Sequence, residues 1–467
     1  MIRSKMKSTW MLGLLLLLGS CQQKGPASGR AEMKGESDSL SVRHGQENAL
    51  SVSDEYPEGY VPVPGIRYQA NYLTGNPERL DVKAALRNVR PLKLSQLGSQ
   101  LDFMVFKDVK GGIFRLIPIE EGCLGVGIGG IWLLDGNLKM IRMLFRNDVD
   151  ITEENGFTNF QTKRYINPDY YEKSSRTLIG VLYDQRDKKN PKSFVRLSLK
   201  DLLSASRPLT PDDIHKRAGI SGNYLLGMAD GYATWTRFTN DVYTFNLRGD
   251  TLCHFTIGEK VNYPPRGNGS YRSGEQATVY HYKGCPMIIM PYGNTVYRMK
   301  DASTLEPVYE LDFGTLHRAT GEEVVGGADV DNAYFLSDWV ETDSYVFMHV
   351  EKGYDCPYAR DKKQVTLYSL IYDKRSKAFF SLPQAEETVH PCPEPDLPDG
   401  IPFWPRKGFS EEQLATFTTG WKLSKSSPEV FKRIPALQGT EKETTSLIIT
   451  LNERYTMLKH YFRQLGL

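Results

Sequence analysis

Five acidic side chains late in the chain have the residue type that glycoside chemistry needs. They are Asp338, Glu341, Asp343, Asp396 and Asp399. Two carboxylates held at a suitable separation can cleave a glycosidic bond, one of them as the acid and the other as base or nucleophile. These residues therefore define one hypothesis, a carbohydrate-active hydrolase or lyase. Sequence spacing does not set their separation, and among 56 acidic residues chance placement is the simpler interpretation.

Aromatic side chains near expected strand ends define a second hypothesis, a binding module without catalysis. Aromatic faces beside carboxylates suit a glycan or a peptide, because sugar C–H faces stack on rings while acids accept hydroxyl protons. Packing inside the fold is the alternative for each ring, and we favour it for each one taken singly. The rings are Trp235, Trp339, Tyr354, Phe403 and Trp404. The candidate ligand-binding residues are Asp338, Trp339, Asp396, Asp399 and Trp404.

Other catalytic patterns are weak. Cys253-His254 and the His390–Cys392 stretch lack the second pair of ligands that a structural metal site needs. The acids of 329–332 lack the glycine and distal glutamate of a calcium loop. The glycines of Gly125–Gly130 precede strand-like residues rather than a helix, and no G-x-S-x-G motif occurs. We therefore predict no catalytic residue, no metal and no cofactor.

The N-terminus has the order of a secretion signal. Three cations at Arg3, Lys5 and Lys7 precede a short apolar run, Trp10–Leu18, which is too short to span a bilayer. The following Leu-Gly-Ser-Cys resembles the lipobox of bacterial lipoproteins, which implies lipidation at Cys21. An ordinary signal peptide with a chance cysteine is the alternative.

The lipobox implies a domain order and a location. Residues 1–20 form the signal peptide, the polar residues 21–55 a flexible tether, and 56–467 the folded domain. We expect a lipid-anchored protein of the cell envelope, at the outer membrane facing the periplasm, with surface display as the alternative. Its ligand would be a glycan, a peptide or an envelope protein.

Charge and cysteine usage fit this location. Loss of the signal changes the formal net charge from +2 to −1, which gives no electrostatic reason to expect nucleic-acid binding. Five cysteines remain after Cys21, so at least one thiol is unpaired. Cys253 with Cys285 and Cys356 with Cys392 are the closest pairs in sequence, Cys123 is the fifth, and isolated buried thiols are the alternative.

The elements that must position these residues are mainly β-strands. Short apolar and aromatic segments alternate with turn residues from Leu101 onward, and most of the 26 Tyr and 20 Phe fall in them. The Asp-Gly-Asn turn inside Ile128–Phe145 predicts a hairpin. Further strand pairs are predicted within 101–118, 177–199, 231–258, 277–314 and 344–382, with a last strand at 446–451.

Helical patterns are few and short. They lie at Asn76–Val89, Leu199–Ala205, Thr210–Gly219 and Ser410–Phe417, and the last could equally begin a strand. The regular recurrence of hairpins is typical of propeller blades of about four strands. We therefore predict an all-β fold, a six-bladed β-propeller, with a pair of β-sandwiches as the structural alternative.

Four stretches resemble the Bacteroides-type six-bladed β-propeller lipoprotein family, which shares its fold with NHL-repeat and TolB-like propellers. They are Leu80–Phe106, Gly293–Gly314, Ser337–Glu351 and the Asp396–Pro405 turn, "DLPDGIPFWP". The turn departs from the family pattern at Ile401, where a second glycine is usual, and at Leu397-Pro398. The resemblance implies a fold and a compartment, and it carries over no catalytic residue.

Overall fold

The computed structural model describes residues 68–452 except 99, 107–108, 110–111, 136–138, 155–156, 188–191, 215–216, 220–223, 230–231, 237–240, 247–250, 259–276, 291, 327–331, 354–365, 385–402, 406–412 and 441–445. The proposed signal, Cys21 and the tether therefore lie outside the described residues. No helix within the described part is long and apolar enough to cross a membrane.

The fold is mostly β, as predicted. The described residues form six sheets, and within each sheet neighbouring strands that follow one another in sequence are antiparallel. The first sheet holds β4 (Ile113–Ile119), β5 (Gly122–Gly127), β6 (Gly130–Leu134) and β7 (Met140–Arg146). The second holds β8 (Asp148–Glu154), β9 (Phe157–Glu172), β10 (Thr177–Asp184), β11 (Lys192–Ser198) and β12 (Arg217–Gly219). The third holds β13 (Tyr224–Ala229), β14 (Tyr232–Thr236), β15 (Asp241–Asn246) and β16 (Thr251–Thr256).

Two of the other three sheets include strands from the N-terminal part of the chain. The fourth sheet holds β17 (Thr278–Tyr282), β18 (Cys285–Ile289), β19 (Thr295–Asp301) and β20 (Thr304–Asp312), with β1 (Asn71–Tyr72) and β2 (Glu78–Asp81) parallel to β20. The fifth sheet holds β21 (Tyr334–Glu341), β22 (Tyr345–Lys352), β23 (Thr366–Asp373) and β24 (Ala378–Ser381). The sixth sheet holds β25 (Gln413–Thr419), β26 (Ser446–Asn452) and β3 (Gln100–Phe106). We call the last one the closing sheet, because its strands come from both ends of the chain.

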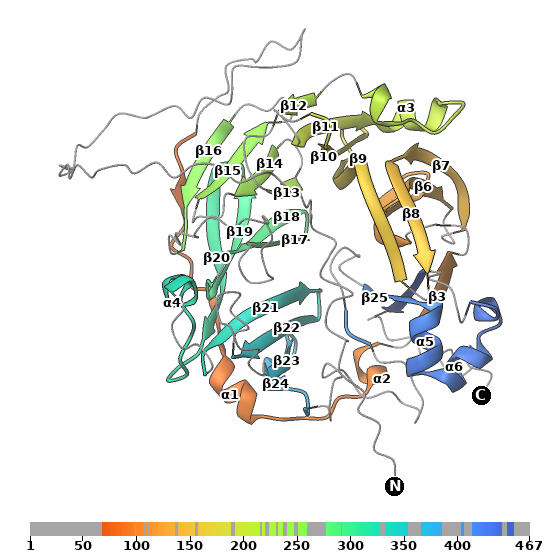
Figure 1. The fold of residues 1–467 in the computed structure, drawn as a ribbon. Helices are drawn as coiled ribbons and strands as arrows, with labels where there is room; N and C mark the ends of the chain where they lie inside the picture. Colours follow the sequence, from red (N-terminus) through yellow and green to blue (C-terminus); the bar gives the residue numbers. More distant parts are fainter. Residues whose placement is uncertain are drawn as a thin grey trace, which may run out of the picture.

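The sheets lie around a common centre (Figure 1). The inner strands of several sheets contact one another: β4 with β9, β9 with β13, β13 with β17, and β17 with β21. Five clusters of buried apolar side chains fill spaces between sheets or beside them. A strand covered on both faces by other parts of the fold is apolar along its length, and β6 is an example, since every one of its residues is buried.

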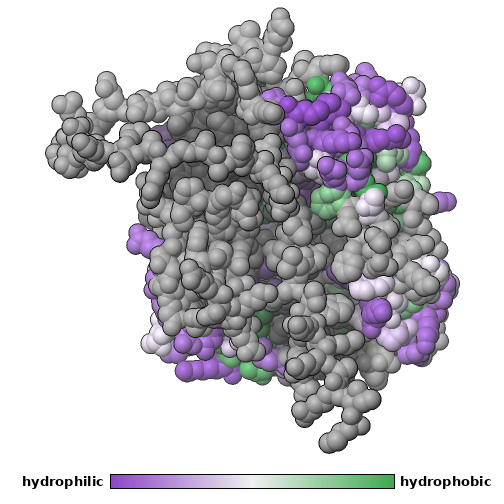
Figure 2. Space-filling model, viewed as in Figure 1, coloured by the Kyte–Doolittle hydropathy of each residue, from purple (hydrophilic) through white to green (hydrophobic). Residues whose placement is uncertain are grey.

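Short helices lie in the connections between strands. They are α1 (Val82–Arg87), α2 (Leu94–Leu97), α3 (Leu199–Ser204), α4 (Gly321–Gly326), α5 (Gly420–Ser426) and α6 (Pro428–Arg433), with 3₁₀ turns at Pro211–Asp213 and Pro435–Leu437. Figure 2 shows that the described surface around α3 and β7 is mostly hydrophilic on that face, with small separate hydrophobic areas.

Most predicted strands and the hairpin of β6 and β7 are confirmed, and two helix predictions need correction. Among its described residues, Thr210–Gly219 holds the 3₁₀ turn and the short strand β12, and strand β2 occupies part of Asn76–Val89 before α1. For Ser410–Phe417 the strand alternative holds, because the described residues 413–417 belong to β25 and pair with β26. Helices α5 and α6 were not predicted from the sequence.

The glycines of Gly125–Gly130 serve close approach between strands. A Cβ atom on Gly127 would lie 1.9 Å from the Gly112 carbonyl oxygen, and one on Gly130, whose φ is +150°, 2.0 Å from that of Phe145. Only glycine allows these strands to approach so closely. The same part of the chain holds Cys123, a buried thiol whose pKa burial raises to about 12.

The thiols of Cys123, Cys253 and Cys285 are free. The Cys253–Cys285 pairing considered from the sequence is therefore not formed, because the two residues belong to different sheets, on β16 and at the start of β18. Cys356 and Cys392 lie outside the described residues.

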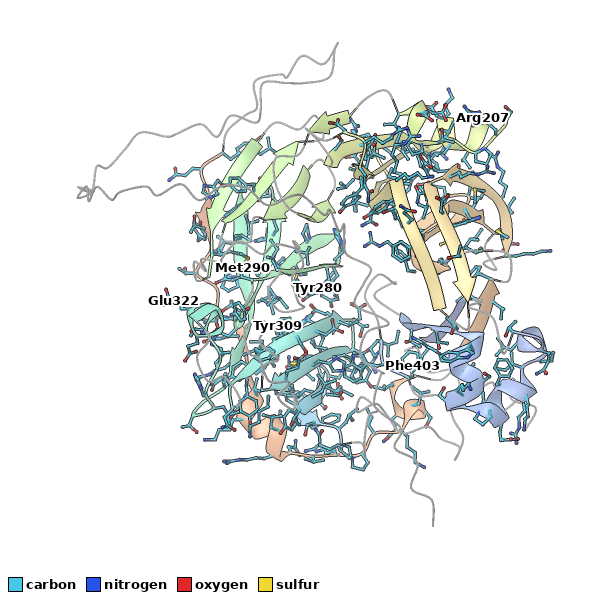
Figure 3. The ribbon with its side chains drawn as sticks, viewed as in Figure 1. Arg207, Tyr280, Met290, Tyr309, Glu322 and Phe403 are labelled. Atoms are coloured by element: carbon cyan, nitrogen blue, oxygen red, sulfur yellow. The ribbon has the colours of Figure 1, made fainter. Side chains whose placement is uncertain are left out.

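The closing sheet depends on an aromatic anchor, Phe403. Its side chain is fully buried between the β21–β24 sheet and the helices α2, α5 and α6 (Figure 3). We expect Phe403→Ala to lower the free energy of unfolding by about 3–5 kcal/mol, because the ring leaves a cavity. Urea denaturation measures this loss, and Phe160→Ala, at a ring that is 36% exposed, is the control. A loss for Phe403→Ala no larger than that of the control would contradict this packing.

Candidate functional site

Strand β21 carries two of the predicted ligand-binding residues on opposite faces. Asp338 pairs with His349 of β22, and Trp339 pairs with Met348. Because side chains alternate along a strand, Asp338 faces the closing sheet together with Phe347, whereas Trp339 faces the β17–β20 sheet. A β-bulge between Leu336 and Asp338 interrupts the pairing just before these residues. Asp338 and Trp339 are therefore adjacent in sequence but lie on opposite faces of the sheet.

Trp339 is part of the packing between two sheets. Its side chain has no exposed surface, and its ring lies 5.5 Å from the ring of Tyr309 and 6.5 Å from that of Tyr280. Both tyrosines belong to the β17–β20 sheet. The packing interpretation of the aromatic residues therefore describes Trp339.

Trp404 lies on the face that Asp338 shares. Its ring stacks on the imidazole of His349 with centroids 4.4 Å apart and an interplanar angle of 13°, and it meets the ring of Phe347 edge-on at 5.6 Å. Asp338, His349 and Trp404 are each partly buried. The fold thus brings two predicted residues, Asp338 and Trp404, to one strand pair through His349. We call these three residues the Asp338–His349–Trp404 cluster.

The turn that carries Trp404 is held by its neighbours. Phe403 is fully buried and Pro405 is buried, so the indole between them has a fixed position. The backbone N–H of Trp339 donates to Asp338 Oδ1 at 2.9 Å, which orients that carboxylate locally. Asp396 and Asp399, the other two predicted residues, lie outside the described residues.

Glu341 is the centre of a buried polar network, which we call the Glu341 network. The hydroxyls of Tyr280 and Tyr309 donate to its two carboxylate oxygens at 2.6 and 2.8 Å (Figure 3). Lys374 Nζ lies 2.5 Å from Glu341 Oε1 and donates to the Thr342 carbonyl at 2.6 Å. The side chain of Glu341 is 1% exposed and that of Lys374 14%. Every member therefore has a partner, which is what a buried charge requires.

Burial dominates the electrostatics of this network. Burial, followed by the negative charge of Glu341, raises the pKa of both Tyr280 and Tyr309. Burial lowers the pKa of Lys374, and the charge of Glu341 opposes this shift. At neutral pH both hydroxyls keep their protons and act as donors to the carboxylate.

The acids of the hydrolase hypothesis do not form a pair among the described residues. Asp338 and Glu341 point to opposite faces of the β21–β24 sheet, because they are an odd number of positions apart in one strand. Asp343 lies at the turn after β21, where it bonds to the Tyr282 hydroxyl and to Lys283. Glu341 is fully engaged in its own network. Among the described residues, Asp338 lies on one face of β21 with aromatic rings, and Glu341 lies on the other face.

Other inner strands carry bulges beside polar residues that the sequence did not single out. Pairing shifts occur in β4 next to Arg115, in β9 between Pro168 and Tyr170, and in β13. Arg115 donates to the Pro168 carbonyl at 2.8 Å, and the Tyr170 and His281 rings stack at 5.8 Å although their sheets are not consecutive. Bulges re-aim side chains and are frequent near binding sites.

His349 was not among the predicted site residues, because a single histidine within an apolar strand carries no motif. The sequence did show that His349 alternates with Phe347 and Glu351, which places all three side chains on one face of the strand. Among the described residues, no group of three or more His, Cys, Asp or Glu side chains could hold a metal ion.

A protein-family model described as a domain of unknown function, DUF4933, matches residues 63–429. No curated protein matches the sequence. Among solved structures, BamB from Moraxella catarrhalis is 9% identical with a TM-score of 0.36, over 76% of this chain and 99% of that one. The N-terminal domain of Nup159 is 7% identical with a TM-score of 0.34, over 74% and 77%. A structural genomics protein of unknown function from Bacteroides thetaiotaomicron VPI-5482 is 9% identical with a TM-score of 0.31, over 78% and 75%. These TM-scores are low, so the fold of this chain is described from its own sheets.

The Glu341 network makes a testable contribution to stability. We expect Glu341→Gln to lower the free energy of unfolding by about 3–5 kcal/mol, because it leaves the Lys374 ammonium buried without a counter-charge. Adding Lys374→Met should recover part of the loss, since the second change removes that ammonium. Chemical denaturation of the single and double variants measures both effects.

Asp343→Asn is the matched control for Glu341→Gln. Asp343 is 45% exposed and pairs with a 61% exposed Lys283, so its loss should cost less than about 1 kcal/mol. Equal losses in Glu341→Gln and Asp343→Asn would contradict the buried-pair interpretation.

Proposed function

Since the chain belongs to the DUF4933 family of domains of unknown function, we propose from its own geometry that it is a lipid-anchored binding module of the cell envelope. It binds a ligand or a partner protein at the Asp338–His349–Trp404 cluster. The ligand is a glycan, a peptide or a segment of an envelope protein. No catalytic step is part of this proposal.

The stack of Trp404 on His349 beside Asp338 is the observation that carries the proposal. A positioned indole offers a flat surface, and a carboxylate on the same side accepts hydroxyl or amine protons. Glu351 lies two residues after His349 on β22, so a second carboxylate shares this face of the sheet. Such a surface favours a hydroxyl-rich or positively charged group over an anion.

The domain that presents this surface is, in our proposal, a six-bladed β-propeller. Six sheets are described, contacts join the inner strands of several of them, and the closing sheet joins β3 to β25 and β26. In this arrangement each sheet is one blade. The inner-strand bulges then surround the axis, where a ligand would approach.

The lipid anchor is the other part of the proposal. The order of cationic segment, apolar run and Leu-Gly-Ser-Cys supports cleavage before Cys21 and lipidation of that residue. The polar tether up to residue 55 then separates the domain from the outer membrane, on the periplasmic side. The binding face stays accessible to soluble or envelope-bound partners.

Binding at Trp404 can be tested by ¹⁹F NMR of protein labelled with 5-fluorotryptophan. The probes are a neutral oligosaccharide, a peptidoglycan-derived glycopeptide and a lysine-rich peptide, and Trp404→Phe identifies the resonance. We expect at least one probe to shift that resonance. Its affinity should fall at least about tenfold, or about 1.4 kcal/mol, in Trp404→Ala and in Asp338→Asn, because each change removes one contact surface.

Trp421→Phe, on helix α5, is the matched control and should leave the affinity unchanged. Thermal melting of each variant separates lost binding from lost folding. The proposal is wrong if a probe binds equally well to the parent protein and to Trp404→Ala.

The anchor has its own test. We expect Cys21→Ser to move the protein from the membrane fraction to the soluble fraction, because a serine offers no thiol for the diacylglyceryl group. Fractionation of cells followed by immunoblotting measures the distribution, and Cys123→Ser, at a buried thiol, is the control. Unchanged membrane retention of Cys21→Ser would contradict lipid anchoring.

A further inference from the structure

The segment Tyr68–Leu97, which we call the belt, runs along the outer side of three sheets before β3 joins the closing sheet (Figure 1). The Tyr68 N–H donates to the Leu252 carbonyl of β16 at 2.8 Å. Strands β1 and β2 then pair with β20, and the Arg90 N–H donates to the Ser381 carbonyl of β24 at 2.9 Å. The belt therefore follows the order of the sheets around the molecule.

The belt also fills the space between two sheets. Leu80, Val82 and Ala85 are at most 2% exposed and belong to the same apolar cluster as Trp339, Tyr280 and Tyr309. The Asn88 side-chain amide donates to the Phe379 carbonyl at 2.9 Å. Removal of the belt would expose this cluster and the outer edge of β20.

Glu78 connects the belt to the Glu341 network. Its carboxylate accepts hydrogen bonds from the Tyr372 hydroxyl and, at 2.7 Å, from Lys377. Burial acts to raise the pKa of Glu78, but the bonds from Lys377 and Tyr372 outweigh burial and lower it. Glu78 also lies beside Tyr309 in the pairing of β2 with β20, and its charge contributes to the raised pKa of Tyr309, after burial and Glu341.

The network in turn reaches the strand of the binding cluster. Tyr309 donates to Glu341 and packs on Trp339. The Trp339 N–H donates to the carboxylate of Asp338. The backbone pairing of Glu78 with Tyr309, the contact of Tyr309 with Trp339 and the Trp339–Asp338 hydrogen bond thus lead from the belt to Asp338 on β21.

We propose that docking of the belt and order at the Asp338–His349–Trp404 cluster are thermodynamically coupled through Glu78, Tyr309, Glu341 and Trp339. The regulatory meaning of this coupling rests on the proposed function, because it assigns the control of that same site to the segment that follows the tether. By linkage, a docked belt strengthens the site by the same factor by which an occupied site strengthens belt docking. Release of the belt therefore lowers ligand affinity.

The first experiment measures hydrogen–deuterium exchange of the full mature chain without any ligand. Glu78→Gln keeps the side-chain volume and removes the charge that fastens the belt. We expect exchange to rise about two- to fivefold both in the belt amides 71–81 and in the β21 amides 337–341, because the lost ion pair is partly exposed and opening of a shared cooperative unit sets both rates.

Arg79→Gln is the matched control on the neighbouring position. Arg79 is 68% exposed and pairs with Asp312 on the opposite side of β2 from Glu78. The exchange rates of the belt amides and of the β21 amides should therefore stay unchanged in Arg79→Gln. Coupling is overturned if Glu78→Gln releases the belt while β21 keeps its protection, and also if neither segment responds to Glu78→Gln.

A second variant tests the route. Tyr309→Phe keeps the ring that packs on Trp339 and removes the hydroxyl bonded to Glu341. In this background, Glu78→Gln should still speed exchange in the belt and should no longer affect β21 beyond the Tyr309→Phe protein itself. A persisting response of β21 overturns the route through Tyr309.

These readouts need no ligand, so they separate the two proposals. Loss of coupling with intact probe binding at Trp404 would overturn only the regulatory inference. Intact coupling without probe binding would overturn only the proposed function.

Discussion

The structure depends on the pairing of β26 with both β25 and β3. Residues Ser446–Asn452 lie in register with Gln413–Thr419 on one side and with Gln100–Phe106 on the other. Segments more than 300 positions apart in the chain thus complete one sheet. The remaining sheets are built mainly from consecutive strands, with β1 and β2 added to the β17–β20 sheet. Without the closing sheet, the β4–β7 sheet and the β21–β24 sheet would each leave an apolar face in water.

Because the β21–β24 sheet is covered on both faces, a charged side chain inside it needs compensating partners. A sheet covered on both faces has little room for charge, and Glu341 is tolerated because two hydroxyls and one ammonium satisfy it. Replacing such a network by apolar groups is often neutral for stability, so burial energy alone does not account for it. Glu341 fixes one relative position of two sheets, since its partners come from β17, from β20 and from the turn after β23. That fixed position determines where the opposite face of β21 presents Asp338.

The sequence predicted the class of fold better than the site. Alternating aromatic strands and turn residues identified most of the hairpins, because that information is local. The choice between helix and strand at β25 stayed open and helices α5 and α6 were missed, since their structure is decided by contacts with β26 and with Phe403. Packing inside the fold, which was favoured for each aromatic ring, describes Phe403. The partnership of Trp404 with His349 could not be predicted, because it joins residues from a turn and a strand with no shared motif.

The two faces of β21 explain how one strand can serve both architecture and recognition. Trp339 and Glu341 commit one face to the β17–β20 sheet, which leaves Asp338 to the other. The bulge before Asp338 breaks the regular pairing, so that this carboxylate lies opposite His349 rather than in the register of the preceding residues. In the proposed coupling, a change in the belt that alters the packing of Tyr309 on Trp339 also moves the backbone that carries Asp338. Rigidity of β21 is therefore the property that would transmit the state of the belt to the binding face.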